Sequence, residues 1–146
     1  MPKIFGIYNK VKSLVGLAAK ASANSADETG TAIDQRSYSC FNSGQVAVNV
    51  GAATGSPSSF SLVITLQESS DNSTWTTAKQ SDDSAAPSDA TVTITAAGVY
   101  CLPFNPAKCK RYLRVRRELT IVSGTSPTVP NGAMVQLGDC EREPVN

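Results

Sequence analysis

Apolar and polar residues alternate along several short segments of this chain. Residues 60–66 read FSLVITL, residues 91–95 read TVTIT and residues 112–121 read YLRVRRELTI. A period of two is typical of an extended strand that buries one face and exposes the other. The pattern therefore predicts β-strands at these three places.

The first of these segments leads into a hairpin. It ends in the polar stretch SSDNS at residues 69–73, and the chain then resumes around Trp75, its only tryptophan. Ser, Asp and Asn bond their own backbone and tolerate left-handed conformations, so this stretch is predicted to reverse the chain. We expect Trp75 to return to the core on the strand 74–78, the alternative being an exposed platform for a sugar ring.

Further strands are expected where short apolar segments lie between turn-forming residues. These segments are 37–41, 45–50, 98–104 and 133–137. Short strands at such spacing predict an all-β, antiparallel sandwich of the jelly-roll type. The core is expected to contain Leu62, Ile64, Leu66, Trp75, Val92, Ile94, Leu113, Val115 and Val135.

The beginning of the chain follows a different period. Ile4, Tyr8, Val11 and Val15 recur at steps of three and four, as on one face of a short amphipathic helix. Lysines interrupt the apolar run, so neither a secretory signal nor a membrane span is expected. The chain should therefore divide into a helical arm with a linker and one sandwich domain. The expected boundaries are residues 1–31 for the arm and linker and 32–146 for the sandwich.

The composition argues against catalysis. The formal net charge is +1, and the chain has no histidine, which is the commonest general base and metal ligand. No nucleophile–base pair, glycine-rich phosphate loop or metal-ligand spacing stands out. The loop acids Asp82, Asp83 and Asp89 do not match a calcium loop, so solvated charge is the favoured interpretation. We expect no enzyme activity, no cofactor and no metal.

The cysteines leave two interpretations. Cys40, Cys101, Cys109 and Cys140 include no CxxC pair. Two disulfides would fit a secreted chain, and four thiols would fit a protein made in a reducing cytoplasm. The thiols are the favoured interpretation.

The densest charge cluster is KCKRYLRVRRE at residues 108–118. Basic residues beside an aromatic are suited to nucleic acid, because they meet phosphates and the ring stacks on a base. The near-zero net charge argues against that partner, and alternation places Arg114 and Arg116 on an outward strand face. A protein contact, in which arginine is enriched, or a solvated strand face is favoured over nucleic acid.

Three segments taken together, LQESSDNSTWTTA, KRYLRV and AMVQLGDCE, carry a resemblance. Over about residues 33–140 the chain resembles the small β-sandwich virion proteins of tailed phages that decorate or cement the head. It departs from the usual turn at Asn72, where a glycine would commonly follow the aspartate. The SxDxxxW and RYxR pair also occurs in discoidin-like jelly rolls, so a glycan-binding module is the alternative.

The resemblance implies a structural protein on the capsid surface, assembled in the host cytoplasm with reduced cysteines. It implies the major capsid protein and further copies of the chain, as a homotrimer, as partners, and neither nucleic acid nor membrane. We expect the capsid and subunit contacts to come from the arm and from the basic strand, the alternative for the arm being that it packs on its own sandwich. The expected contact residues are Ile4, Tyr8, Lys10, Val11, Lys12, Val15, Arg111, Arg114 and Arg116.

Overall fold

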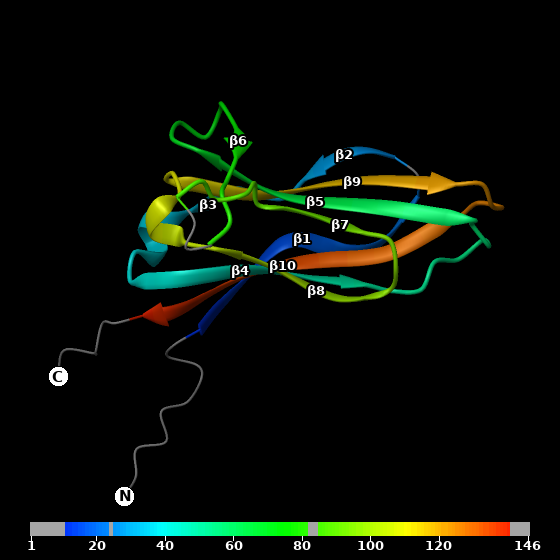
Figure 1. Ribbon diagram of the computed structural model, residues 1–146, viewed down its shortest axis with the longest axis horizontal. Coiled ribbons are helices and arrows are strands. Elements are labelled where there is room, and N and C mark those ends of the chain that lie inside the picture. The colour runs from blue at the N-terminus through cyan, green and yellow to red at the C-terminus, as the bar shows by residue number, and fades with distance from the viewer. Residues whose placement is uncertain (1–10, 24, 82–84, 141–146) are drawn as a thin grey trace, which may run out of the picture.

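Two antiparallel sheets packed face to face make up the protein, as the ribbon in Figure 1 shows. The computed structural model describes residues 11–23, 25–81 and 85–140. Sheet A has the strand order β1-β10-β4-β8, formed by Val11–Ala23, Thr128–Cys140, Phe41–Val50 and Gly98–Phe104. Sheet B has the order β2-β9-β5-β6, formed by Ser25–Thr29, Tyr112–Val122, Ser59–Ser69 and Thr76–Thr77. Two more strands complete sheet B, β3 (Ile33–Asp34) beside β9 and β7 (Thr91–Ile94) beside β5. The predicted all-β antiparallel sandwich is confirmed.

The alternating segments form strands as predicted. Exposed and buried positions alternate along the whole of β9, and β8 spans the predicted residues 98–104. The segment 37–41 is different, because the chain forms a short 3-10 helix over Gln35–Tyr38 and β4 begins only at Phe41. The side chain of Asp34 caps this helix by accepting a hydrogen bond from the Arg36 amide. That cap satisfies an amide that the helix leaves unpaired.

The expected N-terminal helix is wrong over residues 11–19, where the chain forms the first part of β1. This strand pairs with β10 along its length, but the register shifts between Val15 and Leu17 and again before Lys20. At these irregularities Gly16 and Leu17 are both buried, although they are adjacent. The step of four from Val11 to Val15, read in the sequence as helical, lies before the first shift and is also compatible with a strand, because residues an even number apart share one strand face, and both valines are exposed. Ile4, Tyr8 and the other residues before Val11 lie outside the described part of the chain.

The predicted hairpin between β5 and β6 is confirmed. One carboxylate oxygen of Asp71 accepts hydrogen bonds from the amides of Ser73 (2.9 Å) and Thr74 (2.7 Å) and from the Ser69 hydroxyl (2.8 Å). The amides of Thr74 and Ser73, followed by the Ser69 hydroxyl, hold the pKa of Asp71 well below its usual value. Asn72 has φ +58°, a left-handed conformation that asparagine tolerates, so it replaces the usual glycine.

The predicted core is confirmed at most positions. Seven of the predicted residues are at most 1% exposed, namely Leu62, Ile64, Leu66, Ile94, Leu113, Val115 and Val135. Val92 is half-buried against them. The prediction for Trp75 is wrong, since the turn continues past it and β6 begins only at Thr76. Its ring is half-buried beside Arg114 on the outside of sheet B.

A buried arginine ties the two sheets together along one edge. Arg117 is 4% exposed on the inner face of β9, and it donates to Asn131 Oδ1 on β10 (2.7 Å) and to the carboxylate of Glu28 on β2. Asn131 also donates to the Ser22 hydroxyl on β1 (3.0 Å), and Glu28 pairs with Lys20. Lys20 and then Arg117 lower the pKa of Glu28. This polar cluster supplies the partners that a buried guanidinium requires.

A disulfide joins Cys40 to Cys140, so the prediction of four reduced thiols is wrong. The two Cα atoms lie 4.9 Å apart, because Cys140 pairs with Phe41 where β10 ends and β4 begins. Cys101 is an exposed thiol, whereas Cys109 is half-buried. Burial, with a smaller contribution from the charge of Glu68, raises the pKa of Cys109 to about 12, so this thiol stays protonated.

Candidate interaction surfaces

The predicted contact residues fall into two groups on opposite sides of the sandwich. Val11, Lys12 and Val15 belong to β1 at the edge of sheet A, whereas Arg114 and Arg116 lie on the outer face of sheet B. Arg111 directly precedes β9 and belongs with the second group. The remaining three, Ile4, Tyr8 and Lys10, lie outside the described residues. The structure therefore separates one expected surface into two.

On the outer face of sheet B, two of the three predicted arginines bind acids of the same chain. Arg111 donates from Nε and Nη2 to the two carboxylate oxygens of Asp34, at 3.1 and 2.7 Å. Arg116 binds Asp27, with Nε 2.7 Å from Oδ1, and lies 3.5 Å from a carboxylate oxygen of Glu118. Because Arg111 donates both hydrogen bonds, it lowers the pKa of Asp34. The cluster is thus largely neutralised within the fold.

Arg114 is the exception among the three. Its Nε donates to the neutral side-chain oxygen of Gln67 at 2.8 Å, and its guanidinium lies 4.2 Å from the centre of the Trp75 ring. Burial, and then the nearby charge of Arg116, lowers the pKa of Arg114. The contact with Trp75 is a cation–π interaction. It occupies a ring that would otherwise be free to stack on a sugar.

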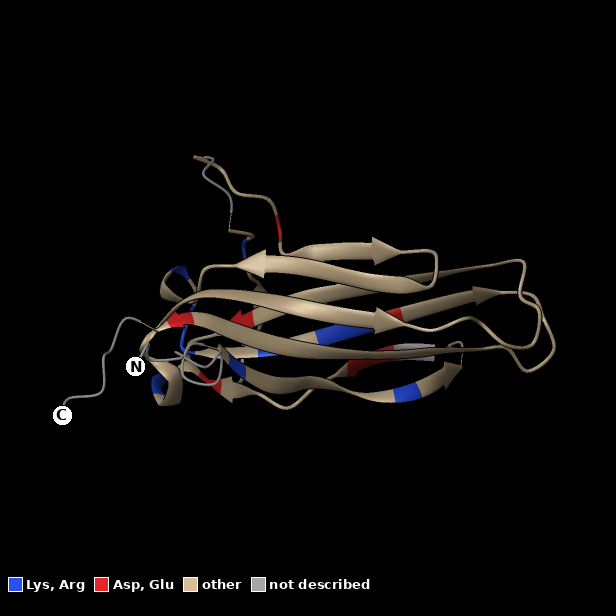
Figure 2. Cartoon of the chain, turned by 90° about the horizontal axis from the view of Figure 1, so that it is seen from below, with Lys and Arg blue, Asp and Glu red and all other residues tan. Residues whose placement is uncertain are grey.

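The outer face of sheet A, meaning the face turned away from sheet B, has a different composition. Strands β4 and β8 contain no charged residue, β10 contains Asp139 and β1 contains Lys12 and Lys20. Figure 2 is turned toward this side and shows these strands mostly in tan. Cross-strand pairing places four uncharged residues in one row, namely Val15, Met134, Ala47 and Cys101.

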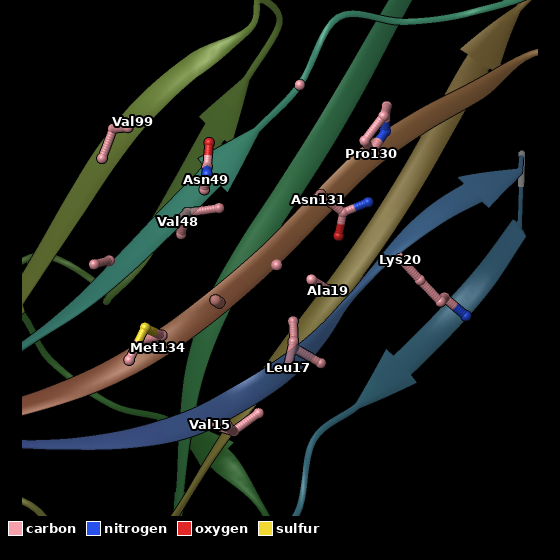
Figure 3. Close-up of a pocket in the computed structure, with 14 residues that line it drawn as sticks. Val15, Leu17, Ala19, Lys20, Val48, Asn49, Val99, Pro130, Asn131 and Met134 are labelled. Atoms are coloured by element: carbon pink, nitrogen blue, oxygen red, sulfur yellow. The ribbon is translucent and has the colours of Figure 1, made fainter.

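A shallow groove crosses this face. It has a volume of about 780 Å³ and runs from β1 across β10 and β4 to β8, as the close-up in Figure 3 shows. Its most exposed apolar side chains are Val99 (72%), Val15 (65%) and Met134 (44%). Ala47, Gly132 and Pro130 also line it, and its polar lining residues are Lys20, Asn49 and Asn131, so most of the surface consists of small or apolar side chains. We call this surface the sheet A groove.

Sequence reasoning named Val15 but missed Met134 and Val99. A signal was present, because alternation in the predicted strands 98–104 and 133–137 places both residues outward. Outward positions of a half-exposed sheet are normally polar. Apolar residues at several of them indicate a covered or binding face.

Two further observations bear on the class of protein. Within the described residues, no group of three or more His, Cys, Asp or Glu side chains could hold a metal ion. The same part of the chain contains no helix that is long and apolar enough to cross a membrane.

Comparison with known proteins shows the fold. No protein-family model matches the sequence, and no curated protein matches it. Among solved structures, the chain is similar to the PBSX exported protein XepA, with a TM-score of 0.57 and 14% identity over 92% of this chain. The match covers 39% of XepA, so this chain spans well under half of that protein.

Two other solved structures align less closely. The SPBc2 prophage-derived protein YomS has a TM-score of 0.41 and 16% identity, covering 86% of this chain and 92% of YomS. A chain in the structure of infectious bursal disease virus Gx strain aligns with a TM-score of 0.47 and 10% identity. This alignment covers 90% of this chain and 33% of the viral chain. At these identities the similarity to XepA establishes a shared sandwich fold and nothing more.

Proposed function

We propose that the protein is a structural, non-enzymatic component of a tailed-phage virion that decorates the capsid and stabilises it by bridging major capsid subunits. The observation that carries this proposal is the sheet A groove, in which Val15, Val99 and Met134 are exposed and Lys20 is the one charged lining residue. The sequence resemblance to phage decoration proteins supplies the class of partner. The sandwich fold shared with XepA is compatible with this class.

Burial of the groove residues gives the physical basis for attachment. Fully burying one Val or Met side chain contributes about 1.5–3 kcal/mol, and three such side chains are exposed here. The charged lining residue Lys20 is already paired with Glu28, so a partner that covers this face needs no opposing charge and most of the gain survives desolvation. Many copies, each held by a modest apolar contact, can brace a capsid collectively.

The remaining predicted contacts take secondary places in this proposal. Val11 and Lys12 continue the same edge strand and would flank the contact made by Val15, with Ile4, Tyr8 and Lys10 on the arm that precedes it. The basic group forms a second contact, in which Arg114 is the most available because its polar partner is neutral. Arg111 and Arg116 would have to exchange their carboxylates for those of the capsid.

A binding experiment with purified capsids that lack the protein tests the proposal. We expect Met134→Asp and Val15→Asp each to weaken binding at least tenfold, or about 1.4 kcal/mol, because each buries a charge in an apolar contact. The matched control is Thr120→Asp, an exposed position on β9 of sheet B. Circular dichroism verifies that each variant is folded.

The expected salt dependence sharpens this test. Apolar attachment through the groove should persist at high salt, whereas attachment through the arginines would weaken as ions screen the pairs. Undiminished capsid occupancy by both groove variants would overturn the proposal. Binding that instead disappears with salt and with Arg114→Gln would move the contact to sheet B. Binding of the isolated protein to sugars would favour the glycan-binding alternative.

A further inference from the structure

The exposed edges of the two sheets are protected to different degrees. Strand β1 forms one edge of sheet A and contains Lys12, Lys20 and two register shifts. Lysines and bulges on an edge strand oppose pairing with another chain. Each edge of sheet B is formed by two short strands, β2 with β3 and β6 with β7. Strand β8 is the edge that lacks these devices, because its seven residues, GVYCLPF, are uncharged and continuous. Its one protective residue is Pro103, near the end.

The hydrogen bonds around Pro103 show which groups of β8 face outward. The Pro103 carbonyl accepts a hydrogen bond from the Ser81 amide at 3.2 Å, on the side away from β4. Hydrogen bonding alternates along an antiparallel strand, so the amides and carbonyls of Val99 and Cys101 face the same way as this carbonyl. The side chains of both residues are exposed. Within the described residues, β8 pairs with no named strand other than β4, and the isolated bridge between Phe104 and Gln80 covers only its last residues.

We propose that β8 pairs antiparallel with β8 of a second copy of this chain, with Val99 of each copy opposite Cys101 of the other. This register pairs two residues of each strand through both their amides and their carbonyls, which satisfies the outward groups of Val99 and Cys101. It is centred on Tyr100, so Pro103 and its contact with Ser81 lie beyond the overlap. The two-fold arrangement needs no change in either strand.

Charge and shape favour a second copy as the occupant. The strand has no charge, so an identical strand brings neither repulsion nor an unpaired ion. Directly opposed residues of antiparallel strands project to the same face, so the two sheet A grooves would lie side by side on one continuous sheet. Such a dimer presents two equivalent apolar surfaces in one direction, which multiplies weak attachment. The pairing itself does not depend on the capsid role.

The test uses the full chain in free solution, by sedimentation velocity over a range of concentrations. We expect a monomer–dimer equilibrium, and we expect Val99→Lys to weaken it at least tenfold, because edge lysines oppose strand pairing. The control is Val122→Lys, at a valine that is also exposed but lies at the end of β9. A monomer at every concentration would overturn the proposal. So would a trimer, since isologous pairing closes at two copies.

A crosslinking experiment tests the register. In the Val99→Cys variant, the new thiol would lie opposite Cys101 of the other copy, at the roughly 5.5 Å Cα separation of such a pair, which a disulfide can span. Mild oxidation should therefore yield a covalent dimer. The Thr93→Cys variant places a new thiol on sheet B and measures how much covalent dimer forms by random collision. Adding Cys101→Ser to Val99→Cys removes the opposing thiol and should reduce the covalent dimer to that level. Equal crosslinking in all three variants would refute the register.

Discussion

The two sheets differ in how they are held together and in what they present to solvent. Sheet A has four strands, three of them ten or more residues long, an outer face with almost no charge, and a disulfide where β4 meets β10. Sheet B has short edge strands, and ion pairs bind one of them to β9, from Asp27 to Arg116 and from Glu28 to Arg117. One sheet is thus secured by a covalent bond and the other by charge.

This difference shows that charge density is a poor guide to a binding surface. The basic segment 108–118 looks like an interaction site in the sequence, but its acids arrive from β2 and β3, far away along the chain. A charge that is already paired gains little from a new partner. On the mostly uncharged outer face of sheet A, Val15 and Val99 stay exposed within the described part of the chain, so this face gains more from being covered.

Low pH should cause the largest loss in the free energy of unfolding. This loss should come from the charged contacts rather than from the disulfide. The folded-state pKa values of Glu28, Asp34 and Asp71 are all lowered. Their stabilisation is therefore complete above the unfolded carboxyl pKa of about 4 and is lost as the pH falls through the lower folded values. Chemical denaturation at a series of pH values should show constant stability from neutral pH to about pH 5 and a decline below pH 4. An unchanged midpoint at pH 3 would contradict the prediction.

Loss of the disulfide, which joins two strands of sheet A, should have the next largest effect on the free energy of unfolding of the whole domain. The bond closes a loop of 100 residues, for which the loss of chain entropy in the unfolded state predicts about 4.7 kcal/mol of stabilisation. We expect the Cys40→Ala and Cys140→Ala double variant to lose stability of this order in urea unfolding. The matched control, Cys101→Ser, retains the bond and should unfold at nearly the wild-type urea concentration. Equal stability of wild-type protein with and without reductant would contradict the prediction.

Removing the carboxylate from the buried arginine should cost somewhat less. Glu28→Gln leaves Arg117 in the interior with Asn131 as its remaining partner, and we expect a loss of about 2–3 kcal/mol, below the value for a fully buried pair. Adding Arg117→Met removes the buried charge and should restore part of this loss. A double variant that is less stable than Glu28→Gln would show that the guanidinium contributes mainly by packing.

The smallest effect is expected at the tryptophan. Because Trp75 lies outside the core, Trp75→Ala should cost about 1 kcal/mol, mostly the cation–π contact with Arg114 and partial burial. Phe104→Ala, in which a fully buried ring is lost, is the comparison and should cost about 3–5 kcal/mol. Thermal unfolding monitored by circular dichroism measures both. Equal losses of stability in Trp75→Ala and Phe104→Ala would indicate that Trp75 packs in the core.

Local pattern determined much of the fold. Alternation in segments 60–66, 91–95 and 112–121 predicted β5, β7 and β9, and the side-chain preferences of residues 69–73 predicted the hairpin turn. These features depend on neighbours in the chain, because strand periodicity and turn chemistry act over a few residues. Alternation even placed Arg117 on the buried face, although the acid that makes this position tolerable lies on another strand.

The tertiary structure decided what depends on distant partners. Residues 11–19 became a strand because β10 provides hydrogen-bond partners, and the step of four from Val11 to Val15 fits one face of a strand as well as one face of a helix. The Cys40–Cys140 bond, the neutralised arginines and the sheet A groove each join segments that are far apart in the chain. The sequence by itself determined that segments such as 60–66, 91–95 and 112–121 extend and which face of each is apolar. Only the packing of two sheets decided which apolar positions are covered and which are left for a partner, since burial depends on what lies opposite.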